Sequence, residues 1–153
     1  MALTSEAAVP LSLTKITTRH GIVAIVDDDP QISRALGLWL ELQDLRSIHH
    51  INGESLLHSI HQDDGGLTLH FAVTNTVSIP LVGAVLDLIL PGITGIELAW
   101  ALRRLSPALP IVLITALDEE ERVRYGALPS GIHCLKKPFN LDALEDALFP
   151  LLD

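Results

Sequence analysis

The stretch Gly21-Ile22-Val23-Ala24-Ile25-Val26-Asp27-Asp28-Asp29 runs from apolar residues directly into three aspartates. A short run rich in β-branched residues is typical of a buried strand, and the chain direction places the carboxylates at its carboxyl end. Neighbouring carboxylates repel each other by roughly 3 kcal/mol per pair at ~5 Å and an effective dielectric constant near 20. Because a packed domain keeps such repulsion where a cation relieves it, the stretch predicts a cation site. The alternative is an acidic turn in which Asp29 or Pro30 begins a helix.

Apolar runs alternate with helical patterns along the rest of the chain. Strands are expected at 21–27, 45–51, 81–87, 111–115 and 132–136, and helices near 30–42, 53–61, 94–105, 118–126 and 140–149. This alternation predicts an α/β fold with a parallel sheet covered on both faces. Right-handed crossovers make it a doubly wound three-layer sandwich. Residues 1–19 are expected to form a flexible leader, and 20–153 the domain.

Residues 62–80 do not fit this alternation and are interpreted as an insertion. Two segments with a two-residue period, 67–73 and 77–81, flank the polar pair Thr74-Asn75. They predict an extra β-hairpin before the third strand of the sheet, with an ordered surface loop as an equal alternative.

Composition excludes several classes of function. The 153 residues are 48% hydrophobic, which supports one globular domain with its own core. The net charge of −9 opposes binding of nucleic acid or anionic membranes by this chain alone. A single cysteine, Cys134, excludes an internal disulfide and is typical of a reducing compartment. Since no apolar run reaches the ~18 residues of a membrane span, we expect a cytoplasmic protein.

The carboxyl ends of the predicted strands carry a set of chemically related groups. The first strand ends at Asp27-Asp28, the third at Asp87, the fourth at Thr115 and the fifth at Lys136-Lys137-Pro138. In doubly wound sheets the functional site lies at this edge. Carboxylates can hold Mg²⁺ or act as a covalent nucleophile, and a lysine can pair with phosphoryl oxygens. The set therefore predicts phosphoryl transfer to a carboxylate.

The chain resembles the receiver domain of response regulators in bacterial two-component signalling, over about residues 20–150. The resemblance rests on Ile25-Val26-Asp27-Asp28-Asp29, on Asp87-Leu88-Ile89-Leu90-Pro91-Gly92-Ile93-Thr94-Gly95-Ile96-Glu97-Leu98, on the Ile-Val-Leu-Ile-Thr-Ala segment at 111–116, and on Lys137-Pro138-Phe139. It implies a flavodoxin-like fold whose five strands lie in the order 2-1-3-4-5.

The resemblance also implies the reaction and the partners. Asp87 would accept a phosphoryl group from the phosphohistidine of a sensor histidine kinase or a phosphotransfer protein. Thr115 would follow the phosphoryl group, Lys137 would pair with it, and Lys137-Pro138 would be a cis peptide. The output partner is not identified. The domain would catalyse only its own phosphorylation and dephosphorylation.

The metal site is likewise implied by the resemblance. Asp27, Asp28 and Asp87, together with the backbone carbonyl of Ile89, would hold Mg²⁺. No other cofactor is expected.

Three features depart from the family pattern. The insertion at about 62–80 lengthens the gap before Asp87 by roughly 15 residues, well above ordinary loop lengths, and is a candidate contact for a partner or a homodimer. Cys134 occupies the position of the family's aromatic switch. The helix after Thr115 looks short, which would alter the usual output face.

Rival hypotheses come from other classes of protein. An aspartyl-phosphate phosphohydrolase would place its nucleophile on the first strand, which Asp27-Asp28-Asp29 matches poorly. A phosphorylation-independent adaptor, or the receiver part of a longer DNA-binding regulator, is also compatible with the fold. His58 and His61 are interpreted as a solvated helix face rather than a zinc site.

Overall fold

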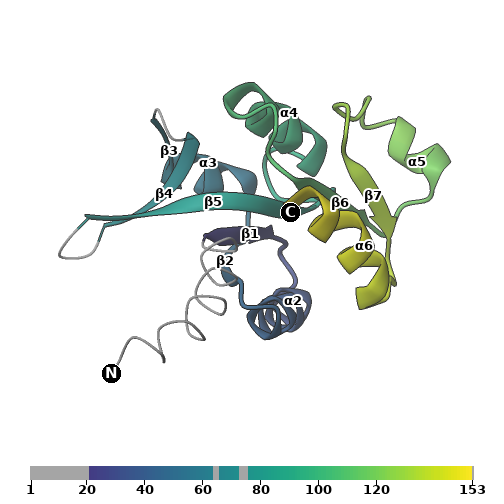
Figure 1. The fold of residues 1–153 in the computed structure, drawn as a ribbon. Coiled ribbons are helices and arrows are strands. Elements are labelled where there is room, and N and C mark those ends of the chain that lie inside the picture. The colour runs from purple at the N-terminus through teal and green to yellow at the C-terminus, as the bar shows by residue number, and fades with distance from the viewer. Residues whose placement is uncertain (1–20, 64–65, 73–75, 153) are drawn as a thin grey trace.

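The computed structural model describes residues 21–63, 66–72 and 76–152, and the leader predicted at 1–19 lies outside these residues (Figure 1). In chain order the elements are β1 (Ile22–Val26), α2 (Pro30–Leu42), β2 (Arg46–His50), α3 (Gly53–Ser59), β3 (Ile60–Asp63), β4 (Gly66–Ala72), β5 (Thr76–Asp87), α4 (Gly95–Leu105), β6 (Ile111–Thr115), α5 (Glu119–Val123), β7 (His133–Lys136) and α6 (Leu141–Leu152).

Five strands form the parallel part of the sheet. β1 pairs with β2 and β5, β5 also pairs with β6, and β6 pairs with β7, which gives the spatial order β2-β1-β5-β6-β7. Every residue of β1 and of β6 is buried, as expected for strands covered on both faces. The predicted fold class, a doubly wound α/β sandwich, is confirmed.

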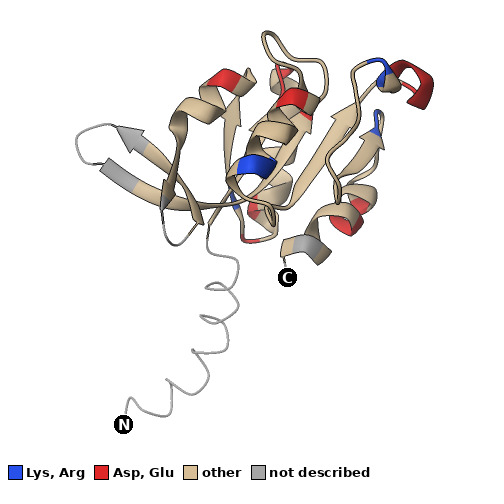
Figure 2. Ribbon diagram, turned by 90° about the horizontal axis from the view of Figure 1, so that it is seen from above, with Lys and Arg blue, Asp and Glu red and all other residues tan. Residues whose placement is uncertain are grey.

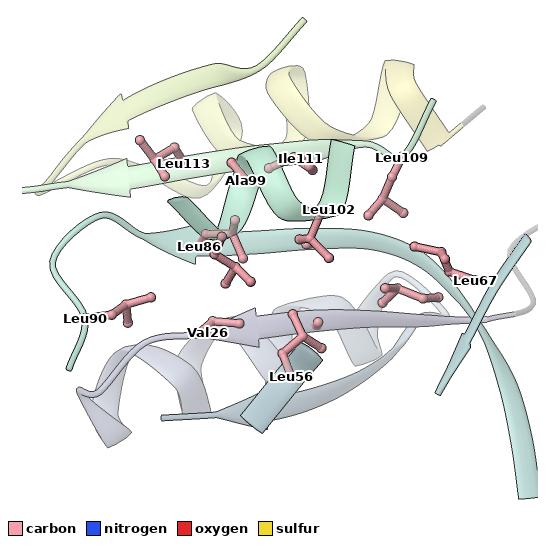
Figure 3. Packing of buried hydrophobic residues seen from close by; sticks show 14 of the residues in the cluster. Val26, Leu56, Leu67, Leu86, Leu90, Ala99, Leu102, Leu109, Ile111 and Leu113 are labelled. Atoms are coloured by element: carbon pink, nitrogen blue, oxygen red, sulfur yellow. The ribbon is translucent and has the colours of Figure 1, made fainter. Parts of the chain in front are cut away.

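The helices form two layers, with α2 and α6 on one face of the sheet and α3 and α4 on the other (Figure 1). Alternate residues of β1 point to the two sides. Val23 and Ile25 pack with α2 and α6, whereas Ala24 and Val26 pack with α3 and α4. Figure 3 shows the second cluster, where side chains of the helices meet those of β1, β5 and β6. Among the described residues, no helix combines the length and the apolar character that a membrane span requires.

β3, β4 and the first half of β5 form an antiparallel extension of the sheet, here called the β3–β4 arm. β3 pairs with β4, and β4 pairs with the part of β5 from Thr76 to Pro80. The structure therefore has the β-hairpin rather than the ordered loop, and the strand predicted at 81–87 begins at Thr76. Leu67 and Leu69 of β4 are buried in the cluster on the α3–α4 side, so the arm shares the main core.

The helix predicted over 53–61 ends before Ile60. Ile60 belongs to β3 and pairs with the fully buried Leu69, so cross-strand packing outweighs the helical periodicity at this point. The prediction that His58 and His61 share one helix face is wrong for His61. Its ring stacks on that of His70 in β4, with 3.5 Å between the ring centroids.

The helix after β6 is short, as its sequence predicts. α5 has five residues and forms an acidic segment at the edge of the molecule beyond β7 (Figure 2). Asp118 caps α5 by accepting a hydrogen bond from the N–H of Glu121, and Thr94 caps α4 in the same way through Glu97. These caps satisfy N–H groups that have no partner inside the helix.

Candidate functional site

Four chemically active side chains meet at the carboxyl edge of the parallel sheet. Asp27 follows β1, Asp87 ends β5, Thr115 ends β6 and Lys137 follows β7. The strand registers align these ends, because Asp87 lies opposite Ile114 in β6, next to Thr115. Lys137 is held at the same level by its backbone N–H, which donates to the carbonyl of Thr115 at 2.7 Å.

Asp27, Asp28 and Asp87 form a carboxylate cluster. One oxygen from each side chain lies within 4.8 Å of the other two. Asp27 is fully buried and Asp87 is 7% exposed, whereas Asp28 is exposed to solvent. Ligands of a single Mg²⁺ lie about 3–4 Å apart, given metal–oxygen distances of about 2.1 Å. These three oxygens therefore suit a small divalent cation that keeps several water ligands.

Lys137 bridges the two buried carboxylates. Its Nζ lies 3.0 Å from Asp87 Oδ2 and 3.3 Å from Asp27 Oδ2. The Lys137–Pro138 peptide is cis, as predicted. The neighbouring Lys136 is exposed. One ammonium thus partly neutralises two acids whose side chains are removed from water.

Burial and charge shift two pKa values at the site. Burial raises the pKa of Asp87, and the negative charge of Asp27 adds to this effect, while the hydrogen bond and positive charge of Lys137 oppose it. Burial alone would lower the pKa of Lys137. Its hydrogen bonds and attraction to Asp87 and Asp27 outweigh burial, so the pKa of Lys137 is raised. Lys137 is therefore an ammonium at neutral pH.

Thr115 lies beside this cluster but bonds elsewhere in this conformation. Its side chain is 1% exposed, and its Oγ1 accepts a hydrogen bond from the N–H of Leu117 at 3.1 Å. A hydroxyl can still donate its own proton while it accepts. Thr115 can therefore donate a hydrogen bond to a group attached to Asp87 and still accept the one from the N–H of Leu117.

The β5–α4 loop, Leu88 to Thr94, is tightly closed at its base. The N–H of Gly95 donates to the carbonyl of Leu88 at 2.7 Å, and a Cβ at position 95 would collide with the carbonyl oxygen of Asp87. Gly92 has a φ of +78°, a conformation that glycine adopts at little cost. Both glycines thus allow the tight course of this loop. The N–H of Ile89 donates to Asp87 Oδ1 at 3.3 Å.

Three residues outside the predicted catalytic and metal-binding set support this site. The N–H of Asp29 donates to Asp27 Oδ1 at 2.8 Å, while the Asp29 side chain caps α2. His49 Nε2 donates to the backbone carbonyl of Asp27 at 2.7 Å. Glu54 of α3 accepts a hydrogen bond from the N–H of Ile93. The helix start expected at Asp29 or Pro30 is confirmed by this cap, whereas no signal in the sequence pointed to His49 or Glu54.

Cys134 stands on β7 where the family has an aromatic residue. It is half-buried against the core cluster on the α3–α4 side. Burial raises the pKa of its thiol, so the thiol stays protonated and weakly nucleophilic. Cys134 is therefore a packing residue of this cluster.

Comparisons with known proteins agree with this geometry. Residues 79–149 match the family model of the response regulator receiver domain. The chain is 29% identical to a cyclic di-GMP phosphodiesterase of Thermotoga maritima over 80% of this chain and 28% of that protein. It is 28% identical to the transcriptional regulatory protein YkoG of Bacillus subtilis over 81% of this chain and 47% of that protein. The chain thus spans less than half the length of these curated relatives.

Solved structures show the same fold. The BeF3-activated receiver domain of DrrB, a Thermotoga maritima protein, superposes with a TM-score of 0.65 at 25% identity, covering 87% of this chain and 97% of that domain. A sensor protein from Polaromonas sp. JS666 superposes with a TM-score of 0.63 at 26% identity, covering 87% of this chain and 96% of that one. The family match over residues 79–149, the relatives and the shared fold together show a response regulator receiver domain of two-component systems.

Proposed function

We propose that Asp87 accepts a phosphoryl group from the phosphohistidine of a sensor histidine kinase or a phosphotransfer protein. The observation that carries the proposal is the convergence of Asp27, Asp28 and Asp87 with Lys137 at one edge of the sheet. An oxygen of Asp87 would form a bond to phosphorus as the bond between phosphorus and the donor imidazole nitrogen breaks. The imidazole keeps that electron pair and leaves as a neutral group after taking up a proton.

The residues of this chain would position and neutralise the transferred group. Asp27, Asp28 and Asp87, with the backbone carbonyl of Ile89, would hold Mg²⁺, which supplies positive charge to the phosphoryl oxygens. Lys137 would pair with another phosphoryl oxygen as a compact cation. The hydroxyl of Thr115 would donate a hydrogen bond to a third phosphoryl oxygen. Most of the catalytic effect is then orientation and charge stabilisation.

The output would be a change in protein contacts. Phosphorylation adds charge of roughly −1.5 to −2, and the movement of Thr115 and Lys137 would shift the domain between two conformations with different partner affinities. We propose a cytoplasmic domain extending over 20–153, with the β3–β4 arm as an addition at about 62–80. The domain would catalyse only its own phosphorylation and dephosphorylation, and the arm would be a contact for a partner or a homodimer. The curated relatives named as transcriptional regulators are longer proteins, so a partner domain in the same polypeptide is one form this contact could take.

Beryllofluoride with Mg²⁺ tests the proposal. It should produce a spectroscopic change in the wild type and no such change in Asp87→Asn. The control Asp146→Asn, which replaces an exposed acid of α6, should respond like the wild type. The DrrB receiver domain was solved in a BeF3-activated form, which supports the choice of probe. A wild type that neither responds to beryllofluoride nor takes a phosphoryl group from acetyl phosphate would contradict the proposal. Equal partner affinity for wild type, Asp87→Asn and Asp87→Glu would favour the adaptor instead.

A further inference from the structure

The tip of the β5–α4 loop rests on the N-terminus of α3. The carboxylate of Glu54 accepts a hydrogen bond from the backbone N–H of Ile93, with Oε2 and N 3.2 Å apart. The two residues are 39 positions apart in the sequence, so the bond joins separate elements. It is the contact by which a charged side chain of α3 reaches the loop that follows Asp87.

Two glycines make this close approach available. A Cβ at Gly92 would collide with the Glu54 carboxylate, and a Cβ at Gly53 would lie 2.8 Å from Cδ1 of Ile93. Gly92 also has the positive φ that disfavours other residues. Each glycine therefore leaves room for a side chain of the other element, Gly53 for that of Ile93 and Gly92 for the carboxylate of Glu54.

The chain just before α3 also contacts Asp27, the aspartate that follows β1. The backbone carbonyl of His50 accepts a hydrogen bond from the N–H of Asp27 at 3.1 Å. Two residues further on, the side chain of Asn52 caps α3 by accepting from the N–H of Ser55 at 2.7 Å. The connection from β2 to α3 thus touches Asp27 at one end and the β5–α4 loop, through Glu54, at the other.

We infer that Glu54 is a positioning residue for the cation site. By fixing Ile93 it holds the β5–α4 loop, which carries Ile89, at a set distance from the carboxylates of Asp27 and Asp87. The loop base is already closed by Gly95 and Leu88, so Glu54 restrains the remaining free part. This inference rests on the proposed function, because the Ile89 carbonyl matters only if it contributes to a metal site.

The test compares Glu54→Ala and Glu54→Gln with a matched control, Glu97→Ala. Glu97 is an exposed glutamate like Glu54, and its Oε1 accepts from the N–H of Thr94, the residue after Ile93, at 3.0 Å. That bond lies within the capping box of α4. Removing it should lower stability without releasing the loop tip. Glu54→Gln keeps an oxygen acceptor but removes the charge.

Amide hydrogen exchange of Ile93 is measured on the metal-free protein, and Mg²⁺ affinity is measured by titration. In Glu54→Ala the amide hydrogen of Ile93 should exchange faster, and Mg²⁺ should bind about two- to tenfold more weakly, the range expected for one lost hydrogen bond. Glu54→Gln should restore both values toward wild type, and Glu97→Ala should keep wild-type Mg²⁺ affinity.

Unchanged Ile93 exchange and Mg²⁺ affinity in Glu54→Ala would overturn the inference. Equal loss of affinity in the Ala and Gln variants, with Ile93 exchange unchanged in both, would also overturn it, since the effect would then be charge rather than position. A wild type that binds no Mg²⁺ would instead contradict the proposed function, while the exchange of Ile93 in the metal-free protein would still test the contact.

Discussion

Replacing Lys137 by alanine leaves two buried carboxylates without their shared cation. At an effective dielectric constant near 20, a pair of unit charges about 3 Å apart attracts by about 5 kcal/mol, and Lys137 makes two such pairs, at 3.0 and 3.3 Å. The carboxylates of Asp27 and Asp87 repel each other by at least about 3 kcal/mol at the separation observed. Desolvation of the ammonium, whose side chain is 19% exposed, offsets much of the attraction. We therefore expect Lys137→Ala to lower the free energy of unfolding by about 3 kcal/mol without divalent cations, as for other broken buried pairs.

The effect should depend on pH with a definite sign. In the wild type the raised pKa of Lys137 means that its stabilisation is complete below the ordinary lysine pKa and is lost only as pH rises through the raised value. Burial already raises the pKa of Asp87, and Lys137 opposes this effect. Without the ammonium, the pKa of Asp87 therefore rises further. The folded variant then binds protons more readily than the unfolded chain, so its stability increases as pH falls. The difference in the free energy of unfolding between wild type and Lys137→Ala should therefore become smaller as the pH falls from about 7.5 to about 5.

Urea denaturation at both pH values, with and without Mg²⁺, measures these differences. Mg²⁺ should stabilise Lys137→Ala more than wild type, because the cation supplies the charge that the variant lacks. Lys136→Ala, which removes the exposed neighbouring lysine, is the control and should change stability by less than about 0.5 kcal/mol. The reasoning is refuted if Lys137→Ala is as stable as Lys136→Ala, or if its deficit is the same at both pH values.

Three further predictions concern other parts of the molecule. Trp100 donates its indole N–H to the carbonyl of Ala127 at 2.9 Å, so beryllofluoride should change tryptophan fluorescence in the wild type but not in Trp100→Phe, where only the buried Trp39 remains; a full response in Trp100→Phe would contradict this. Leu69→Ala should cost about 3 kcal/mol in a single unfolding transition, because Leu69 is fully buried in the shared core; a separate early transition would show instead that the arm unfolds alone. Ile89 is 45% exposed and offers no polar group to orient an attacking water, so Ile89→Asn should lose its phosphoryl group faster than wild type; equal lifetimes of the two phosphorylated proteins would count against this.

The location of the site could be predicted from the sequence because one rule of sheet topology places most of its residues. Parallel strands end at the same edge of a sheet, so Asp27, Asp87 and Thr115 could be brought together without knowledge of any side-chain conformation. Their roles as nucleophile, ligand and switch stay predictions, since they rest on chemistry that only an experiment with a phosphoryl donor can test.

The residues that support the site could not be predicted in this way. His49 reaches the carbonyl of Asp27 because β2 pairs with β1 so that His49 lies opposite Ile25, and that register is not written in either strand alone. Glu54 reaches Ile93, 39 residues away in the sequence, because Gly92 leaves room for its carboxylate. The end of α3 was misplaced for the same reason, since Ile60 leaves the helix to pair with a distant strand.

Cys134 raises the question of how a change at Asp87 could reach the surface without an aromatic switch. Thr115 accepts from the N–H of Leu117, and it can keep that bond while it donates to a phosphoryl oxygen. A shift of Thr115 toward Asp87 would therefore pull Leu117, which leads directly into α5.

The segment beyond α5 is anchored separately. Trp100 donates a hydrogen bond to the carbonyl of Ala127, and Arg103 donates one to the carbonyl of Ser130. Because both anchors are on α4, the chain from Leu117 to Ala127 would be pulled at one end and fixed at the other. We expect this segment, which carries the exposed Val123 and Tyr125, to rearrange when Thr115 moves. No residue of α5 is buried, and a segment with few buried contacts opens at a low cost in free energy.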